Sequence, residues 1–310
     1  MKVHFLFWIG FAVLFLIVLS IDLFATGHRK EAIKVRTALI WTLVWVSTAF
    51  LFSVFIHFYF PEGIEKAFEF IAGYLVEYSL SVDNLFVFIM IFSVMGIKPK
   101  NQPRILKWGI IGAVVLRIVF IIAGVGLIQK FQFMIYIFGI ILILASYNML
   151  TSEGKKIEPE KNIFVRLASR LFKVKTDVES DHFFIRQNKK TFVTVGFITL
   201  ILIESTDVIF AVDSIPAVLA ITRDPFIAIT SNLFAVLGLR SLFFALSGIL
   251  NLFRFLKYGI SFILFFVGVK MLISHYVEIS IQLSLGIIVF CLIVSVLASV
   301  FYKGKNTGNA

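Results

Sequence analysis

Five acidic side chains lie in the interior of two long apolar segments of this chain of 310 residues: Glu77, Asp83, Glu204, Asp207 and Asp213. If these segments cross a membrane, each charged side chain at the bilayer centre costs at least about 2.5–3.5 kcal/mol. At that cost the five residues cannot face lipid. They must instead face one another, basic side chains, water or a bound ion, and they are the first candidates for a functional site.

The charge balance of the apolar segments favours a doubly charged ligand. Three basic residues, Arg117, Arg240 and Lys270, also lie inside such segments. Five acids against three bases leave two negative charges, which one divalent cation would neutralise. Protons could replace part of that charge, which offers a chemical route to metal/proton exchange.

The side chains around the acids offer oxygen atoms as ligands. Asn84 and Ser214 each follow an acid directly, and neither segment contains His or Cys. Oxygen ligands suit Mg²⁺, Ca²⁺ and Mn²⁺, and the missing His and Cys argue against zinc and copper. The predicted metal ligands are Glu77, Asp83, Asn84, Glu204, Asp207, Asp213 and Ser214.

Helix geometry restricts how these ligands can meet. Glu204 and Asp207 are three residues apart and share a helix face, but Asp207 and Asp213 are six apart, which splays them by about 120°. The sequence therefore predicts either local unwinding or two separate sites. Pro216 is the predicted helix break, because proline cannot donate a hydrogen bond to the carbonyl four residues earlier.

The elements that must position these residues are membrane helices. Hydrophobic residues make up 60% of the chain and charged residues 15%, against about 25% charged in soluble domains. A membrane helix needs roughly 20 apolar residues, and nine segments qualify: 5–23, 38–60, 68–95, 106–128, 132–150, 192–220, 226–250, 256–274 and 279–301. The predicted fold class is an all-α polytopic membrane protein.

Basic residues alternate in number between successive connections. Counting Lys and Arg at the two sides of the spans gives 22 against 4. This asymmetry predicts an N-terminus outside and a C-terminus in the cytoplasm. It also explains the net charge of +11 without a nucleic-acid partner.

Three short signatures recur in the same order in spans 3–5 and 6–8. They pair Glu77-Tyr-Ser-Leu-Ser-Val-Asp83-Asn84 with Asp207-Val-Ile-Phe-Ala-Val-Asp213-Ser214, Leu116-Arg117 with Leu239-Arg240, and Met149-Leu150 with Met271-Leu272. Three helices separate the copies, so the copies are expected to be inverted, as in many secondary transporters. The predicted divisions are 1–60, 61–150 (first repeat), 151–191 (a basic cytoplasmic loop), 192–275 (second repeat) and 276–310.

Other polar residues have two interpretations each. Arg117 and Arg240 act as structural counter-ions or in gating, and Lys270 balances charge or extends toward the cytoplasmic surface. Asp22 is a helix cap or surface residue, or else joins the site, and Asn232 pairs with neighbouring helices or binds the ion. In the loop, apolar residues on one face of 163–172 indicate either a helix lying on the inner leaflet or an ordinary solvated helix.

The sequence resembles the TerC family of integral membrane proteins, and most closely its Alx branch. The resemblance runs nearly from end to end and rests on the two acidic segments above, on the stretch from Thr230 to Arg240, on Leu256-Lys-Tyr-Gly259 and on His182-Phe-Phe-Ile-Arg186. It implies export of manganese across the bacterial inner membrane, together with an older association with tellurite resistance. The seven predicted ligands match the family's motif positions.

The expected function is therefore that of a secondary transporter exporting a divalent cation, Mn²⁺ first, with a proton or sodium as possible coupling ion. No phosphate-binding loop for ATP is present, and no tightly bound organic cofactor is expected. One alternative is a non-transporting membrane partner in metal stress or tellurite resistance. A remote one is an intramembrane aspartyl protease, although its Gly-x-Gly-Asp pattern is missing.

Overall fold

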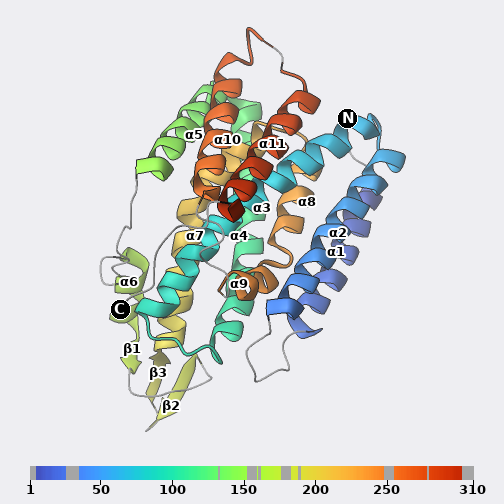
Figure 1. The fold of residues 1–310 in the computed structure, drawn as a ribbon. Coiled ribbons are helices and arrows are strands. Elements are labelled where there is room, and N and C mark those ends of the chain that lie inside the picture. The colour runs from blue at the N-terminus through green and yellow to red at the C-terminus, as the bar shows by residue number, and fades with distance from the viewer. Residues whose placement is uncertain are drawn as a thin grey trace.

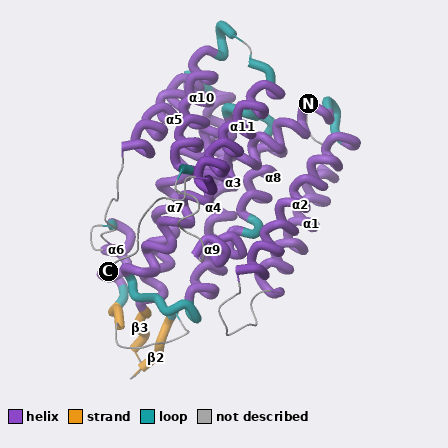
Figure 2. Tube along the Cα trace, viewed as in Figure 1, coloured by secondary structure: helices purple, strands orange, loops and turns teal. Residues whose placement is uncertain are grey.

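A computed structural model describes residues 5–25, 35–131, 133–151, 159, 162–175, 183–187, 190–247, 255–277 and 279–301. Within these residues, nine segments are helical, long and apolar enough to cross a membrane. Figure 1 shows them as one bundle, and Figure 2 shows that the only strands drawn gather at one end of it. The prediction of an all-α polytopic membrane protein is confirmed.

The spanning helices match the predicted segments closely. They are α1 (Phe5–Ala25), α2 (Val35–Tyr59), α3 (Gly63–Val94), α4 (Gln102–Lys130), α5 (Met134–Thr151), α7 (Val195–Leu219), the pair α8 (Pro225–Val236) and α9 (Leu239–Ser247), α10 (Leu256–Ile273) and α11 (Ile281–Phe301). Large apolar side chains of α1, α2 and α11 are exposed on the bundle surface, where lipid would cover them.

The seventh span lies at the centre of the bundle and is broken. The stretch Pro225–Ser247 is buried throughout its most apolar window, and α8 packs against α3 and α4. The helix stops at Leu237 and restarts after Gly238, whose φ is +82°. A glycine tolerates that backbone conformation, and neighbouring helices shield the freed backbone groups from lipid, as a break inside a membrane requires.

The helices of the two predicted repeats pair reciprocally. The first helix of each copy packs along the second helix of the other, α3 with α8 and α7 with α4, and the third helices α5 and α10 pack together. α3 ends and α7 begins at the end of the bundle that carries the sheet (Figure 1), so the two helices run in opposite directions.

Two contacts between α5 and α10 show the same reciprocal pairing at the level of single residues. A Cβ on Gly139 would lie 3.0 Å from the carbonyl oxygen of Gly268, and the hydroxyl of Ser146 lies 3.0 Å from that of Ser261. In the register of the sequence signatures, Gly139 corresponds to Ser261 and Ser146 to Gly268. A twofold axis between the copies would require such exchanged pairs, while the duplication itself stays a prediction.

The loop of residues 151–191 contains more structure than the sequence indicates. Within its described residues are α6 (Ile163–Leu171), β1 (Lys173–Lys175) and β2 (Phe184–Gln187), and β3 (Lys190–Thr194) leads directly into α7. The strands form a sheet in the order β1-β3-β2, with β1 parallel and β2 antiparallel to β3. Strands this short carry too few residues for a period-2 pattern to reveal them.

Candidate functional site

Glu77 is the most completely buried acid among the described side chains of the predicted site. Its side chain is fully buried on α3 and accepts hydrogen bonds from three groups: Arg117 Nη1, Asn232 Nδ2 at 2.9 Å and Ser81 Oγ at 3.3 Å. A buried carboxylate is stable only with such partners. Glu77 and Ser81 belong to α3, Arg117 belongs to α4 and Asn232 belongs to α8. The network therefore joins three central helices.

Arg117 links this network to the second acidic helix. Its Nη2 lies 3.7 Å from Asp207 Oδ1, and its Nη1 also donates to Asn232 Oδ1 at 3.1 Å. Arg117 is 3% exposed and Asp207 5%. One guanidinium therefore bridges Glu77 and Asp207, which the sequence signatures place at equivalent positions of the two repeats. Asn232 pairs with neighbouring helices, as expected, but it does so inside the predicted site.

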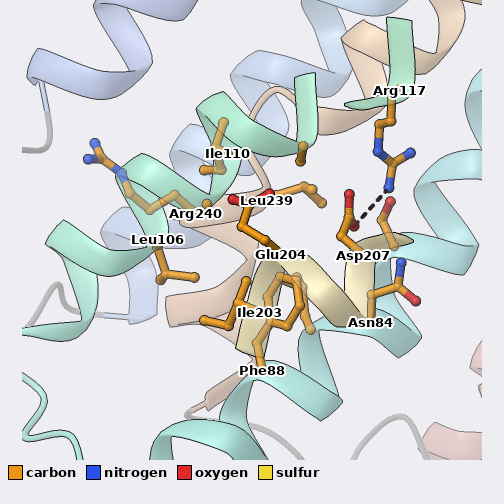
Figure 3. Close-up of a pocket in the computed structure, with 14 residues that line it drawn as sticks. Asn84, Phe88, Leu106, Ile110, Arg117, Ile203, Glu204, Asp207, Leu239 and Arg240 are labelled. Atoms are coloured by element: carbon orange, nitrogen blue, oxygen red, sulfur yellow. Dashed lines mark ion pairs between the residues drawn. The ribbon is translucent and has the colours of Figure 1, made fainter. Parts of the chain in front are cut away.

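Glu204 faces a small cavity beside this network. The cavity measures ≈ 20 Å³, enough for about one water molecule, and Figure 3 shows Glu204 and Asp207 on one helix with Arg117 beyond Asp207. The Glu204 carboxyl group occupies the space that a Cβ on Gly112 would need. Among the described residues, no hydrogen bond or ion pair reaches this carboxyl group.

The small polar residues near the acids do not all lie at the same cavity. Asn84 and Ser81 line the same cavity as Glu204 and Asp207. Ser214 is buried, and its hydroxyl has no hydrogen-bond partner within the part of the chain that the structure describes. An unpartnered buried hydroxyl costs free energy, so Ser214 remains a candidate ligand.

Of the second acids of the two motifs, only Asp213 has a described side chain, and it does not join the network. The side chain of Asp83 lies outside the described residues, although its backbone belongs to α3. Asp213 is partly buried on α7, and no ion pair or hydrogen bond connects it to Asp207. Because α7 is continuous between them, the two residues point in different directions, as an unbroken helix requires.

The predicted helix break at Pro216 is wrong. α7 continues through Pro216 to Leu219, and Pro216 itself accepts a hydrogen bond from Ala220 at 2.9 Å. Proline removes only one hydrogen bond near the helix end, which a buried helix tolerates. The break lies instead in the next span, at Gly238, just before Arg240.

Arg240 is buried against the end of α1. It donates to the backbone oxygens of Asp22 and of Leu23, the latter at 3.3 Å. Cations stabilise helix C-termini because the last carbonyls carry partial negative charge. Asp22 was expected at a helix end and is 1% exposed there, so it is buried beside Arg240. Arg240 also lines the Glu204 cavity (Figure 3).

Lys270 and a further acid lie at the opposite end of the bundle from the sheet. Lys270 donates to Ser284 Oγ at 2.8 Å and is attracted by Glu69. Since the cytoplasmic surface is predicted at the sheet end, its extension toward that surface is not observed. Glu69 accepts from Thr222 Oγ1 at 2.5 Å and pairs with Lys66 at 3.0 Å.

Sequence reasoning missed Glu69 because it begins the third span, where an acid looks like a surface residue. Its partner Thr222 follows α7 and is distant in sequence. The signal that could have found it was the spacing of eight residues to Glu77, which places the two acids only about 80° apart around α3.

Among the described side chains, no three His, Cys, Asp or Glu residues lie together as a ready-made metal centre. The structure brings Glu77 and Asp207 together through Arg117 and places Glu204 and Asn84 at the adjoining cavity. The seven-residue metal site therefore stays a prediction. His182, quoted for the family resemblance, lies outside the described residues.

Comparison with known proteins identifies the family of this membrane protein. The family model of the integral membrane protein TerC family matches residues 62–307. A Salmonella typhi protein is 42% identical over 290 residues, covering 91% of this chain and 90% of its own, and an Escherichia coli K12 protein is 41% identical with the same coverage. Both are called Alx and carry the provisional description of membrane-bound redox modulators.

A Myxococcus xanthus membrane protein is 41% identical over 292 residues, covering 94% of this chain and 91% of its own. No solved structure matches the chain. The family match includes both acidic motifs, both intramembrane arginines and the broken span, and the relatives cover the chain almost completely. This chain is a multi-pass integral membrane protein that belongs to the TerC family.

Proposed function

We propose that this protein is a secondary transporter that exports a divalent metal cation, Mn²⁺ first, through the site around Glu77 and Asp207. The observation that carries the proposal is the pairing of two buried carboxylates from oppositely directed helices across one cation, the Arg117 guanidinium. Substrate sites of inverted-repeat transporters lie at such helix interfaces.

The chemistry of the surrounding side chains supports a hard cation. Carboxylates, the amide oxygen of Asn84 and the hydroxyls of Ser81 and Ser214 are oxygen ligands, the kind preferred by Mn²⁺, Mg²⁺ and Ca²⁺. Nothing in this ligand set separates these three metals. The choice of manganese and the outward direction rest on the family resemblance.

A thiol–disulfide role within one chain is not supported. Such chemistry needs two cysteines, and the chain contains only Cys291. This residue lies on α11, a helix with many apolar side chains exposed on the bundle surface. The description of the relatives as redox modulators therefore does not point to a dithiol pair in this chain.

The proposal is tested by metal flux in reconstituted vesicles, comparing Mn²⁺, Mg²⁺, Ca²⁺ and Zn²⁺. The wild-type protein should move Mn²⁺ at least about tenfold faster than protein-free vesicles, and Asp207→Asn should lose most of this flux because one ligand charge disappears. Glu65→Gln is the matched control, since Glu65 is an exposed acid on α3. Equal flux in wild-type and Asp207→Asn vesicles would refute the proposal.

A further inference from the structure

The guanidinium of Arg117 lies where a cation bound by Glu77 and Asp207 would have to sit. We propose that Arg117 is a built-in cation that the metal ion must displace, and that Glu204 accepts Arg117 while the metal is bound. This inference rests on the proposed function and adds a mechanism for charge balance during transport.

Charge makes Arg117 and the metal mutually exclusive at this position. Glu77 and Asp207 are almost completely buried, as is Arg117. Two carboxylates and one guanidinium carry a net charge of −1, whereas two carboxylates and one divalent cation are neutral. Adding the cation without removing Arg117 would bury a net positive charge away from water, which is unfavourable.

Glu204 has the geometry of an alternative partner. It lies one turn before Asp207 on the same face of α7, and both residues line the cavity that Arg117 also lines (Figure 3). Long side chains of a helix lean toward its N-terminus. On α4 this tendency directs a long side chain at position 117 toward the level of Ala113 and Gly112, and the Glu204 carboxyl group lies against Gly112.

Arg117 and Glu204 line the same small cavity, and α4 contributes Gly109 and Ala113 to its wall together with Leu106 and Ile110. The two small residues leave space on α4 beside Arg117, so a modest shift of the guanidinium is enough to bring it toward Glu204. Both groups also have unused hydrogen-bonding capacity. Among the described residues, Arg117 Nε is buried without a hydrogen-bond partner, and the Glu204 carboxyl group accepts no hydrogen bond.

The exchange would keep a cation beside Glu77 and Asp207 in both halves of the transport cycle, first the metal ion and then Arg117. With metal bound, Glu77 and Asp207 hold the ion and Glu204 holds Arg117. After release, Arg117 returns to Glu77 and Asp207 and keeps the empty site from recapturing the ion. A protein without Arg117 should therefore bind metal tightly but release it slowly.

The first experiment measures equilibrium Mn²⁺ binding to the purified full-length protein and Mn²⁺ flux in vesicles. Arg117→Gln should bind Mn²⁺ at least about tenfold more tightly than wild type, because a competing charge is gone, and should transport it more slowly. Lys130→Gln is the matched control. It removes an exposed basic residue from the last turn of the same helix, α4, and its affinity should equal that of wild type.

The second experiment separates an Arg117 acceptor from a metal ligand at Glu204. In Glu204→Gln, Arg117 has no alternative partner, so Mn²⁺ affinity should fall. In the double variant Arg117→Gln/Glu204→Gln, affinity should return to that of Arg117→Gln. If Glu204 were instead a ligand, the double variant would stay weaker than Arg117→Gln by the factor that Glu204→Gln costs alone, and the proposal would be overturned.

Size-exclusion chromatography checks that each variant is folded. If Arg117→Gln aggregates, Arg117→Lys keeps the charge but loses the two-pronged contact, and it should show a smaller increase in affinity. An affinity that is unchanged or lower in both Arg117 variants refutes the displacement mechanism. A wild-type protein that neither binds nor transports Mn²⁺ would instead refute the proposed function.

Discussion

At Gly112, the missing side chain leaves the space that the Glu204 carboxyl group occupies. Any larger residue there would push Glu204 out of the cavity or force α4 and α7 apart. Since membrane helices approach closely through small residues, this glycine has two effects: it sets the helix spacing, and it admits an acid between the helices.

Gly112→Ala should therefore reduce metal flux to below about a tenth of the wild-type rate while costing about 1–3 kcal/mol of stability through overpacking. The measurement is Mn²⁺ flux in vesicles, normalised to folded protein. Gly126→Ala is the control on the same helix, because a Cβ there meets nothing within 4 Å. Equal flux in the two variants would show that the position of Glu204 is unimportant.

The acids could be placed inward from sequence alone because a lipid-facing charge is too costly. Their partners could not be assigned in the same way. Whether Arg117 pairs with Glu77, Asp207 or neither depends on the rotation and depth of three helices, which side-chain type does not encode. Arg240, which matches Arg117 in the sequence signatures, contacts the backbone at the end of α1 instead.

Among the elements, the interrupted span α8–α9 departs most from the sequence prediction. Its residues form one apolar run of normal length, so composition predicts a single helix. The interruption needs a residue with positive φ and a buried setting that satisfies the freed backbone. Gly238 supplies the first, but one glycine within an apolar run is also common in unbroken membrane helices.

Gly238→Ala should destabilise the protein by placing a Cβ on a backbone of positive φ and against the Trp45 ring. The conformational strain is about 1–2 kcal/mol, with overpacking in addition. Thermal unfolding in detergent should then show a midpoint lower by about 5 °C or more.

The matched control for this change is Gly10→Ala on α1, where an added Cβ meets nothing within 4 Å. Its unfolding midpoint should stay close to that of wild type. A Gly238→Ala midpoint that also stays there would mean that the span can close into a continuous helix.

Helix α6 presents one buried face and one exposed apolar face. Val165 and Ala168 are buried against the bundle, and Asn162, which caps the helix, donates to Ser205 on α7 at 2.7 Å. Ile163, Phe164 and Leu167 are exposed. Apolar residues on the outer face of a bundle helix are expected to enter the lipid interface, especially beside basic residues, so the structure favours the leaflet interpretation over a solvated helix.

We expect Leu167 to contact lipid. A spin label attached at Leu167→Cys, in a Cys291→Ala background, should collide more with oxygen than with a water-soluble nickel complex when the protein is in vesicles containing anionic lipid. The same label at Ser169→Cys, an exposed polar residue that lies about 160° from Leu167 around the helix, should show the reverse. Water-like accessibility at both positions would assign α6 to the aqueous loop.

At the scale of the whole molecule, the two acidic helices begin at opposite ends of the bundle. The pairing of α3 with α8 and α7 with α4 gives each proposed repeat the same surroundings in the opposite direction. The two arginines, however, make different contacts: Arg117 bridges Glu77 and Asp207, whereas Arg240 contacts the backbone at the end of α1. The two ends of the proposed site therefore differ, as expected for an alternating-access transporter in one of its two states.

The direction of transport has meaning only if the chain has one orientation. The count of 22 against 4 basic residues predicts that the sheet and the connection between α3 and α4 face the cytoplasm. In intact cells of a Cys291→Ala strain, a membrane-impermeant maleimide should then label Phe133→Cys, between α4 and α5, but leave Lys100→Cys, between α3 and α4, unlabelled. Permeabilised cells should label both, which controls for reactivity. Labelling of Lys100→Cys alone in intact cells would mean that the protein has the opposite orientation. The Glu204 cavity lies nearer the sheet than Glu69 does, so it would then take up the ion from outside rather than from the cytoplasm.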